Sequence, residues 1–135
     1  MERQTKPFSK RFRIFTFTVI VCVVAMFFWY RAWDRREMLR TTLLWARVAP
    51  PPAGKHDFII QKEGGFFSRS FRCSFSAAPE EVERWLQQSP GTWALLPEKP
   101  PATTRHYIIS PGGGAQRAEV TVDSSGTVGI YVSWN

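Results

Sequence analysis

Few residues of this chain are of the types that catalyse reactions or bind metals, and their spacing matches no known site. There are two histidines, His56 and His106, and no spacing of cysteine, aspartate or glutamate around them completes a zinc-binding set. The two rings can meet only if the strands that carry them are neighbours. We therefore expect neither a metal site nor a cofactor site, and interpret both histidines as surface residues.

Two further patterns are explained without catalysis. The three glycines at 112–114 lack the lysine and the following serine or threonine of a phosphate-binding loop, so they predict a flexible loop. Glu80, Glu81 and Glu83 fall at the start of a predicted helix, whose positive end accounts for them. No Gly-x-Ser-x-Gly sequence occurs. No catalytic residue is predicted, and we do not expect an enzyme.

Three arginines are expected to share the polar face of a sheet. Arg72, Arg105 and Arg117 all lie in predicted strands, and Glu119 lies beside them. They can form a basic strip on that face, although a solvated surface is the simpler interpretation.

The two cysteines are too far apart in the expected fold to form a disulfide. Cys22 lies within an apolar stretch and Cys73 lies in a predicted strand, where we expect a buried thiol rather than a nucleophile. A domain without disulfides outside the cytoplasm is more typical of a bacterial envelope than of a eukaryotic secreted protein.

The apolar stretch at 14–30 is the dominant feature of the sequence. Its seventeen residues include no charge, and as a helix they span roughly 25 Å, slightly less than the ~30 Å hydrocarbon core of a bilayer. Side chains that favour the lipid–water interface flank it. These membrane-flanking residues are Arg13, Trp29, Tyr30, Arg31 and Trp33. The stretch predicts a single-pass transmembrane helix at 13–33 whose partner is the lipid bilayer.

A buried core helix and a cleaved signal peptide are the alternatives for this stretch. A small domain cannot surround a helix that is apolar on every side, and no small-x-small cleavage site follows the apolar run. An uncleaved signal anchor is therefore favoured. Five lysines and arginines precede the span and five follow it, so the charge count does not decide orientation. The denser N-terminal group favours a cytoplasmic N-terminus and an outside domain, in the plasma (inner) membrane if the source is bacterial.

The net charge of +7 lies entirely around this segment. Residues 1–49 hold ten lysines and arginines against three acids, whereas residues 50–135 hold eight of each sign. Anionic headgroups explain the first group, and a neutral domain lacks the clustered positive charge that binds a phosphate backbone. No nucleic-acid partner is expected.

The remaining sequence predicts an α+β domain after a short linker. The expected organisation is a basic tail at 1–12, the transmembrane helix at 13–33, a juxtamembrane helix at 34–49, a Pro/Gly linker at 50–55 and a domain at 56–135. The helix at 34–49 is interpreted as a stalk, as an interfacial helix, or as a helix docked on a partner or on its own domain.

Within the domain, strands are predicted at 56–62, 66–76 and 105–110, and a helix at 79–88. The segment 89–104 is expected to be irregular and pinned by Trp93. A final hairpin turns at Gly126, and its register pairs Val122 with Val128 and Val120 with Ile130. The predicted fold is a two-layer domain with an antiparallel sheet of four or five strands and one covering helix.

Three functions are compatible with this organisation. The first is a membrane-anchored domain for protein binding or assembly, which uses the exposed sheet face, a sheet edge or the loop at 89–104, and the final strand is the candidate for an open sheet edge. The second is an accessory subunit that interacts through its membrane helix, which has few small residues and no GxxxG pattern. The third is a small enzyme, which the missing catalytic pattern disfavours. The expected partner is another envelope or membrane protein.

Overall fold

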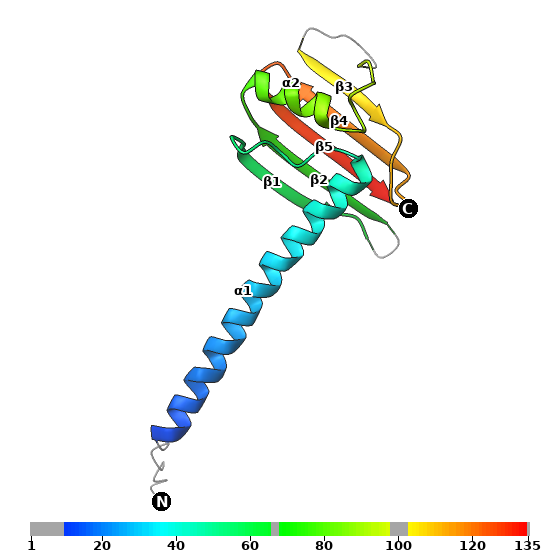
Figure 1. Cartoon of the computed structure of the whole chain (residues 1–135). Coiled ribbons are helices and arrows are strands. Elements are labelled where there is room, and N and C mark those ends of the chain that lie inside the picture. Colours follow the sequence, from blue (N-terminus) through cyan, green and yellow to red (C-terminus); the bar gives the residue numbers. More distant parts are fainter. Residues whose placement is uncertain (1–9, 66–67, 98–102, 135) are drawn as a thin grey trace, which may run out of the picture. The chain divides into compact units, whose positions relative to one another are not determined.

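The computed structural model describes residues 10–65, 68–97 and 103–134. Their elements follow the predicted order (Figure 1), namely α1 (Lys10–Ala46), β1 (His56–Glu63), β2 (Arg69–Ser76), α2 (Pro79–Gln88), β3 (Thr104–Ile109), β4 (Arg117–Asp123) and β5 (Thr127–Trp134). The chain divides into two compact units, Met1–Arg35 and Arg36–Asn135.

In the first unit, the stretch of α1 at 14–30 carries no charge on any side, and the side chains at 12–35 are exposed. No glycine or proline interrupts the sequence of this helix. An 18-residue window has a mean hydropathy of 2.2, and none of it is buried within the protein. The hydroxyls of Thr16 and Thr18 donate to the carbonyls of Phe12 and Ile14 at 2.9 and 3.0 Å, which satisfies their polar groups within the helix. By length and composition, this helix can cross a membrane.

The second unit contains a five-stranded antiparallel sheet in the order β1-β2-β5-β4-β3. Hairpins join β1 to β2 and β4 to β5, and α2 carries the chain from β2 to the opposite edge. The final strand therefore lies in the centre of the sheet, between β2 and β4. The expectation that it forms an open edge was wrong, because β5 returns from its hairpin to pair with β2 along its length. The edges are β1 and β3.

The hairpin between β4 and β5 has the predicted register. Val122 pairs with Val128 and Val120 with Ile130. Gly126 has φ +87°, and its N–H donates to the carbonyl of Asp123 at 3.0 Å. This backbone conformation favours glycine, so the turn residue and the apolar alternation specify the same pairing.

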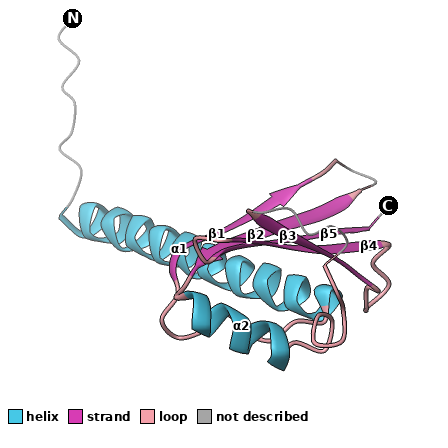
Figure 2. Cartoon of the chain, turned by 90° about the horizontal axis from the view of Figure 1, so that it is seen from above, coloured by secondary structure: helices cyan, strands magenta, loops and turns pink. Residues whose placement is uncertain are grey.

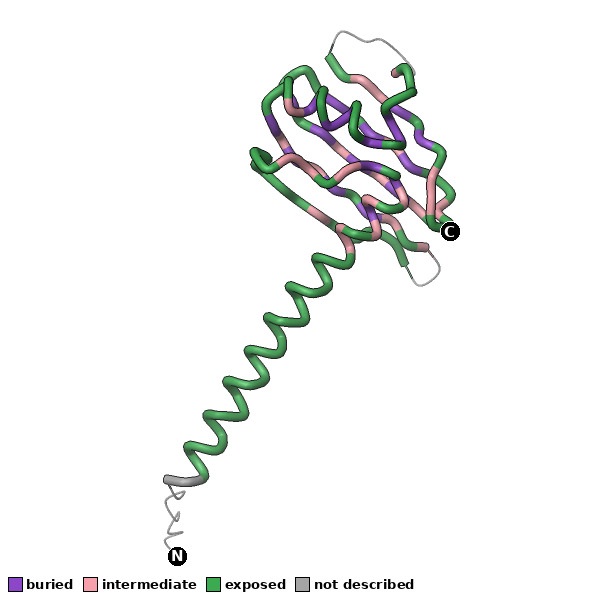
Figure 3. Tube along the Cα trace, viewed as in Figure 1, coloured by how far each residue is buried: buried purple, intermediate pink, exposed green. Residues whose placement is uncertain are grey.

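One face of the sheet forms the core of the domain. Alternate residues of the central strands are buried (Figure 3). They are Phe71, Cys73 and Phe75 from β2, Ala118, Val120 and Val122 from β4, and Val128, Ile130 and Val132 from β5. The α+β prediction is confirmed, including the strand alternation of β2. Phe66 and Phe67, at the start of the predicted strand, lie outside the described residues.

Two helical segments cover this face. Figure 2 shows α2 and the end of α1 on the same side of the sheet. The helix α2 buries Val82, Trp85 and Leu86, and the Trp85 ring meets Phe75 edge-on with centroids 5.4 Å apart.

The end of α1 belongs to the same core. Ala46 and Thr42 are fully buried, and the Thr42 hydroxyl donates to the carbonyl of Met38 at 2.8 Å. The Trp85 indole N–H donates to the carbonyl of Ala49 at 2.8 Å. Of the interpretations of 34–49, the structure therefore shows docking on its own domain for the part from Met38 onward.

The segment after α2 is fixed by small polar residues. The buried Ser89 hydroxyl donates to the carbonyl of Trp85 at 2.8 Å and accepts the N–H of Ala49 at 3.0 Å. The N–H of Gly91 donates to the carbonyl of Arg47 at 2.6 Å. Trp93 is 69% exposed, so the expectation that it pins this segment was wrong. The Ser89 hydroxyl and the Gly91 N–H hold the segment to residues 47–49, just after α1, instead.

Candidate functional site

The candidate site lies on the sheet face opposite the helices, which we call the open face. Strand register places polar side chains there in cross-strand rows. One row contains Gln61, Arg72, Tyr131 and Glu119 from β1, β2, β5 and β4. Antiparallel sheets commonly leave one face in water, so this face needs a specific shape or charge to count as a site.

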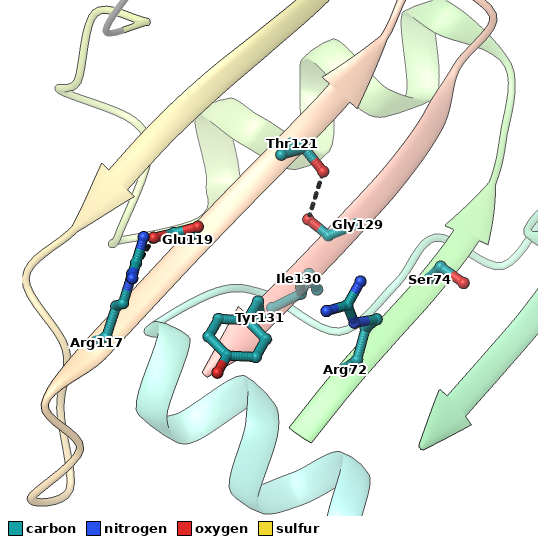
Figure 4. A pocket seen from close by; sticks show the side chains of 8 residues that line it. All are labelled: Arg72, Ser74, Arg117, Glu119, Thr121, Gly129, Ile130 and Tyr131. Atoms are coloured by element: carbon teal, nitrogen blue, oxygen red, sulfur yellow. Dashed lines mark hydrogen bonds and ion pairs between the residues drawn. The ribbon is translucent and has the colours of Figure 1, made fainter. Parts of the chain in front are cut away.

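The open face is hollowed where its residues are small. Gly129 lies between Ser74 and Thr121 across the strands, and it has no side chain to fill the space between them. A hollow of about 460 Å³ results (Figure 4). Its lining residues are Arg72, Ser74, Arg117, Glu119, Thr121, Gly129, Ile130 and Tyr131.

A second hollow, of about 410 Å³, adjoins the first on the other side of Tyr131. Its lining residues are Ser68, Arg69, Ser70, Gln116, Arg117, Tyr131 and Ser133. Arg117 and Tyr131 line both hollows. We call the two hollows together the open-face groove.

Arg72 reaches from β2 over the central strand (Figure 4). Its guanidinium carbon lies 5.6 Å from the centroid of the Tyr131 ring, within cation–π range. Its Nε lies 3.3 Å from a carboxylate oxygen of Glu63. The ring and the carboxylate orient the guanidinium, and both partners remain partly exposed.

Glu119 is the most enclosed charged group of the groove, with a side chain 15% exposed. It accepts a hydrogen bond from the Nε of Arg117, and its other oxygen lies 3.3 Å from Nε2 of His106. Two cationic or polar partners thus compensate this carboxylate. The pair of Glu119 and Arg117 fixes the position of the guanidinium at the junction of the two hollows.

The predicted arginine strip is only partly present. Arg72 and Arg117 lie on the open face with Glu119, as expected. Arg105 lies on the covered face and pairs with Glu83 of α2, because its register partner is the buried Val122. The hydrogen bond to Glu83 raises the pKa of Arg105 above its ordinary value.

The two histidines do not meet. His56 is on β1 and His106 is on β3, at opposite edges of the sheet. His56 instead lies 3.8 Å from a carboxylate oxygen of Asp57. Among the described residues, no group of three histidine, cysteine or acidic side chains is placed to hold a metal ion.

Cys73 is fully buried in the sheet core. Burial raises the pKa of its thiol to about 11, and the positive charge of Lys55 opposes the shift. The thiol is therefore protonated at neutral pH and inaccessible, which disfavours it as a nucleophile.

The residues predicted to flank a membrane all lie on α1. Trp29, Tyr30 and Trp33 are 78, 62 and 61% exposed, and Arg13 and Arg31 are exposed as well. The Arg31 guanidinium carbon lies 5.7 Å from the centroid of the Phe27 ring, one turn earlier.

The groove was missed in the sequence because it depends on strand order. Arg72, Tyr131 and Glu119 come together only because β5 pairs with both β2 and β4. One local signal was present, because Gly129 interrupts a strand of β-branched and aromatic residues. An isolated glycine in a strand often marks a site where a ligand or another backbone segment approaches the strand closely.

No protein-family model matches this chain, and no curated protein and no solved structure match it.

Proposed function

We propose that this chain is a single-pass membrane protein that presents residues 36–135 as a small α+β domain for binding or assembling another membrane or envelope protein. The supporting observation is that the protein leaves two surfaces of opposite character uncovered. These are the apolar surface of α1 and the polar open face with its groove. The first suits a bilayer, and the second suits a polar partner.

The proposal includes an orientation. The N-terminus lies in the cytoplasm and the domain lies outside the plasma membrane of a bacterium. The support for this orientation is the dense basic group before the span. For an outside domain, the lack of a disulfide between Cys22 and Cys73 suits a bacterial envelope better than a eukaryotic secreted protein. Alkaline phosphatase fused after Asn135 should be active, and green fluorescent protein fused there should be dark. A fluorescent green fluorescent protein fusion together with an inactive phosphatase fusion would show that the orientation is the reverse of the proposed one.

A binding module is favoured over an enzyme because the polar groups of the open face already pair with one another. Arg117 and His106 contact Glu119, and Arg72 contacts Glu63 and Tyr131. A general base needs to reach a substrate proton, and a nucleophile needs an adjacent base. These pairs instead set the orientation of guanidinium groups on an accessible surface.

The experiment that tests this function is affinity capture from native membranes after cross-linking. The intact chain should recover a defined membrane or envelope protein. Recovery should persist when residues 14–30 are replaced by an unrelated transmembrane helix of the same length, because the domain carries the binding. Loss of recovery in this replacement variant, with the domain intact, would support the alternative in which the membrane helix carries the interaction.

A further inference from the structure

The open-face groove has the length and shape of a short extended segment. On β5, Gly129 and Ser133 flank Tyr131, and all three lie on the open face. With a rise of about 3.4 Å per residue, the distance from Gly129 to Ser133 is roughly 13 Å, which about four residues of extended chain can follow. The hollows lie on the two sides of Tyr131, so the small residues open the groove and the tyrosine divides it.

The charged side chains of the open face that line the groove include two guanidinium groups and one carboxylate. They are Arg72, Arg117 and Glu119. Arg117 and His106 already contact Glu119, so this carboxylate is paired within the protein. The two exposed guanidinium groups of the lining therefore favour an anionic ligand.

The arginines are oriented so that they can bind a carboxylate. Arg72 approaches Glu63 through Nε, and Arg117 donates to Glu119 through Nε. These contacts use Nε, and the edge between the two terminal amino groups of a guanidinium can bind a carboxylate through two parallel hydrogen bonds. The side chains of Arg72 and Arg117 are 59 and 64% exposed, so a ligand can reach both.

A lipid or nucleic-acid surface fits this groove less well than a protein segment. Glu63 and Glu119 lie among the arginines, and residues 50–135 have equal numbers of acidic and basic residues. Binding to a phosphate surface depends on clustered positive charge without interspersed acids. A side-chain carboxylate needs only one well-placed guanidinium, and the tyrosine ring and serine hydroxyls along β5 suit a peptide.

We propose that the open-face groove binds an extended acidic segment of the partner protein, with one carboxylate of that segment held by Arg72 and another by Arg117. This inference rests on the proposed binding function. Gly129 is part of the site because a Cβ there would lie 2.7 Å from the hydroxyl of Thr121 and would fill the first hollow.

The test uses the full chain in detergent micelles and a fluorescent eight-residue peptide of alternating aspartate and serine. The matched peptide has asparagine in place of aspartate. The aspartate peptide should bind at least tenfold more tightly than the asparagine peptide. Arg72→Gln and Arg117→Gln should each weaken its binding about tenfold or more, which is the loss expected for a charge-assisted contact.

The control variant is Arg84→Gln, which removes the same charge from the exposed side of α2 on the covered side of the sheet. It should leave peptide binding unchanged. A second variant blocks the hollow without removing charge. Gly129→Val combined with Thr121→Ala relieves the close contact and fills the space, and it should weaken binding while far-UV circular dichroism stays unchanged.

Equal binding of the two peptides, or equal effects of Arg72→Gln and Arg84→Gln, would overturn the proposal. The proposal also fails if the chain, reconstituted in phosphatidylcholine liposomes, tethers phosphatidylglycerol vesicles through Arg72 and ignores the peptide. Cross-linking in native membranes separates the two proposals. A partner captured equally well by wild type and by Arg72→Gln/Arg117→Gln would leave the binding function standing and remove the groove as its site.

Discussion

The two faces of the sheet in this protein differ in the side chains they carry and in how far these are buried. The covered face consists of aliphatic and aromatic side chains on β2, β4 and β5 that are almost fully buried beneath α2 and the end of α1. The open face carries arginines, serines, Tyr131 and Glu119, and small residues leave hollows between them. Neighbouring residues of a strand point to opposite faces. A substitution of Ile130 should therefore change the stability of the domain, whereas a substitution of the adjacent Tyr131 should change binding at the open face.

The largest expected effect is the loss of the end of α1 from the covered face. A fragment of residues 36–135 should fold, whereas a fragment of residues 50–135 should not. The shorter fragment lacks the buried Thr42 and Ala46 and the carbonyls of Trp45 and Arg47, which accept hydrogen bonds from Gly112 and Gly91.

Dispersed amide signals in an NMR spectrum measure this outcome. Dispersed signals from the 50–135 fragment would show that the covered face forms without α1. A fragment that begins at residue 56, the domain boundary expected from the sequence, lacks the same contacts with the end of α1. It should therefore also give an NMR spectrum without dispersed amide signals.

The next effect compares adjacent residues of β5. Ile130→Ala should lower the free energy of unfolding by about 2–5 kcal/mol, because it opens a cavity in a fully buried site. Tyr131→Ala should cost less than about 1 kcal/mol, because its side chain lies on the partly exposed open face. Denaturant unfolding of the full chain in micelles, followed by tryptophan fluorescence, measures both values. Equal losses would mean that the open face is covered in the folded protein.

A comparison of two glycines gives a smaller effect. Gly126→Ala should destabilise by about 1–3 kcal/mol, because φ is +87° and the new Cβ would lie 2.2 Å from the carbonyl oxygen of Ala77. Gly129→Ala meets only the movable hydroxyl of Thr121 and should leave stability nearly unchanged. The same unfolding measurement applies. A larger loss for Gly129→Ala would assign that glycine a structural role instead of a role in the groove.

The last effect is a pH dependence from the covered face, which appears only at alkaline pH. The pKa of Cys73 rises from 9.0 to about 11 on folding, so the folded state binds its proton more tightly than the unfolded state. This contribution to stability is fully present below pH 9 and is lost as the pH rises through 11. It amounts to about 3 kcal/mol. We expect the free energy of unfolding to fall more steeply between pH 8 and pH 11 for wild type than for Cys73→Ala. Parallel curves of unfolding free energy against pH would contradict this prediction.

The sequence predicted what depends on local pattern and neighbouring residues. The alternation in β2, the register of the β4–β5 hairpin and the position of α2 all follow from periodicity and turn chemistry. The apolar helix was equally evident, since seventeen consecutive residues carry no charge and include no glycine or proline.

The features that were missed depend on contacts between distant residues. No local signal indicates that β5 inserts between β2 and β4. A strand with one apolar face can lie at the edge of a sheet or at its centre, so its sequence does not decide between the two positions. The role of Ser89 and the burial of Ala46 depend on how the end of α1 meets the segment after α2. The groove depends on the same long-range pairing, which is why Arg105 was wrongly grouped with Arg72 and Arg117.

The most direct test of the open face as the binding surface uses two matched glutamines. Gln61 lies beside Arg72 on the open face, and Gln87 lies on the exposed side of α2. A photoreactive amino acid is placed at one or the other position of the full chain, and the cells are irradiated with the protein in its native membrane. We predict a partner adduct from position 61 that Arg72→Gln removes, and little adduct from position 87. An adduct from position 87 alone, or one from position 61 that survives Arg72→Gln, would contradict binding through the open face.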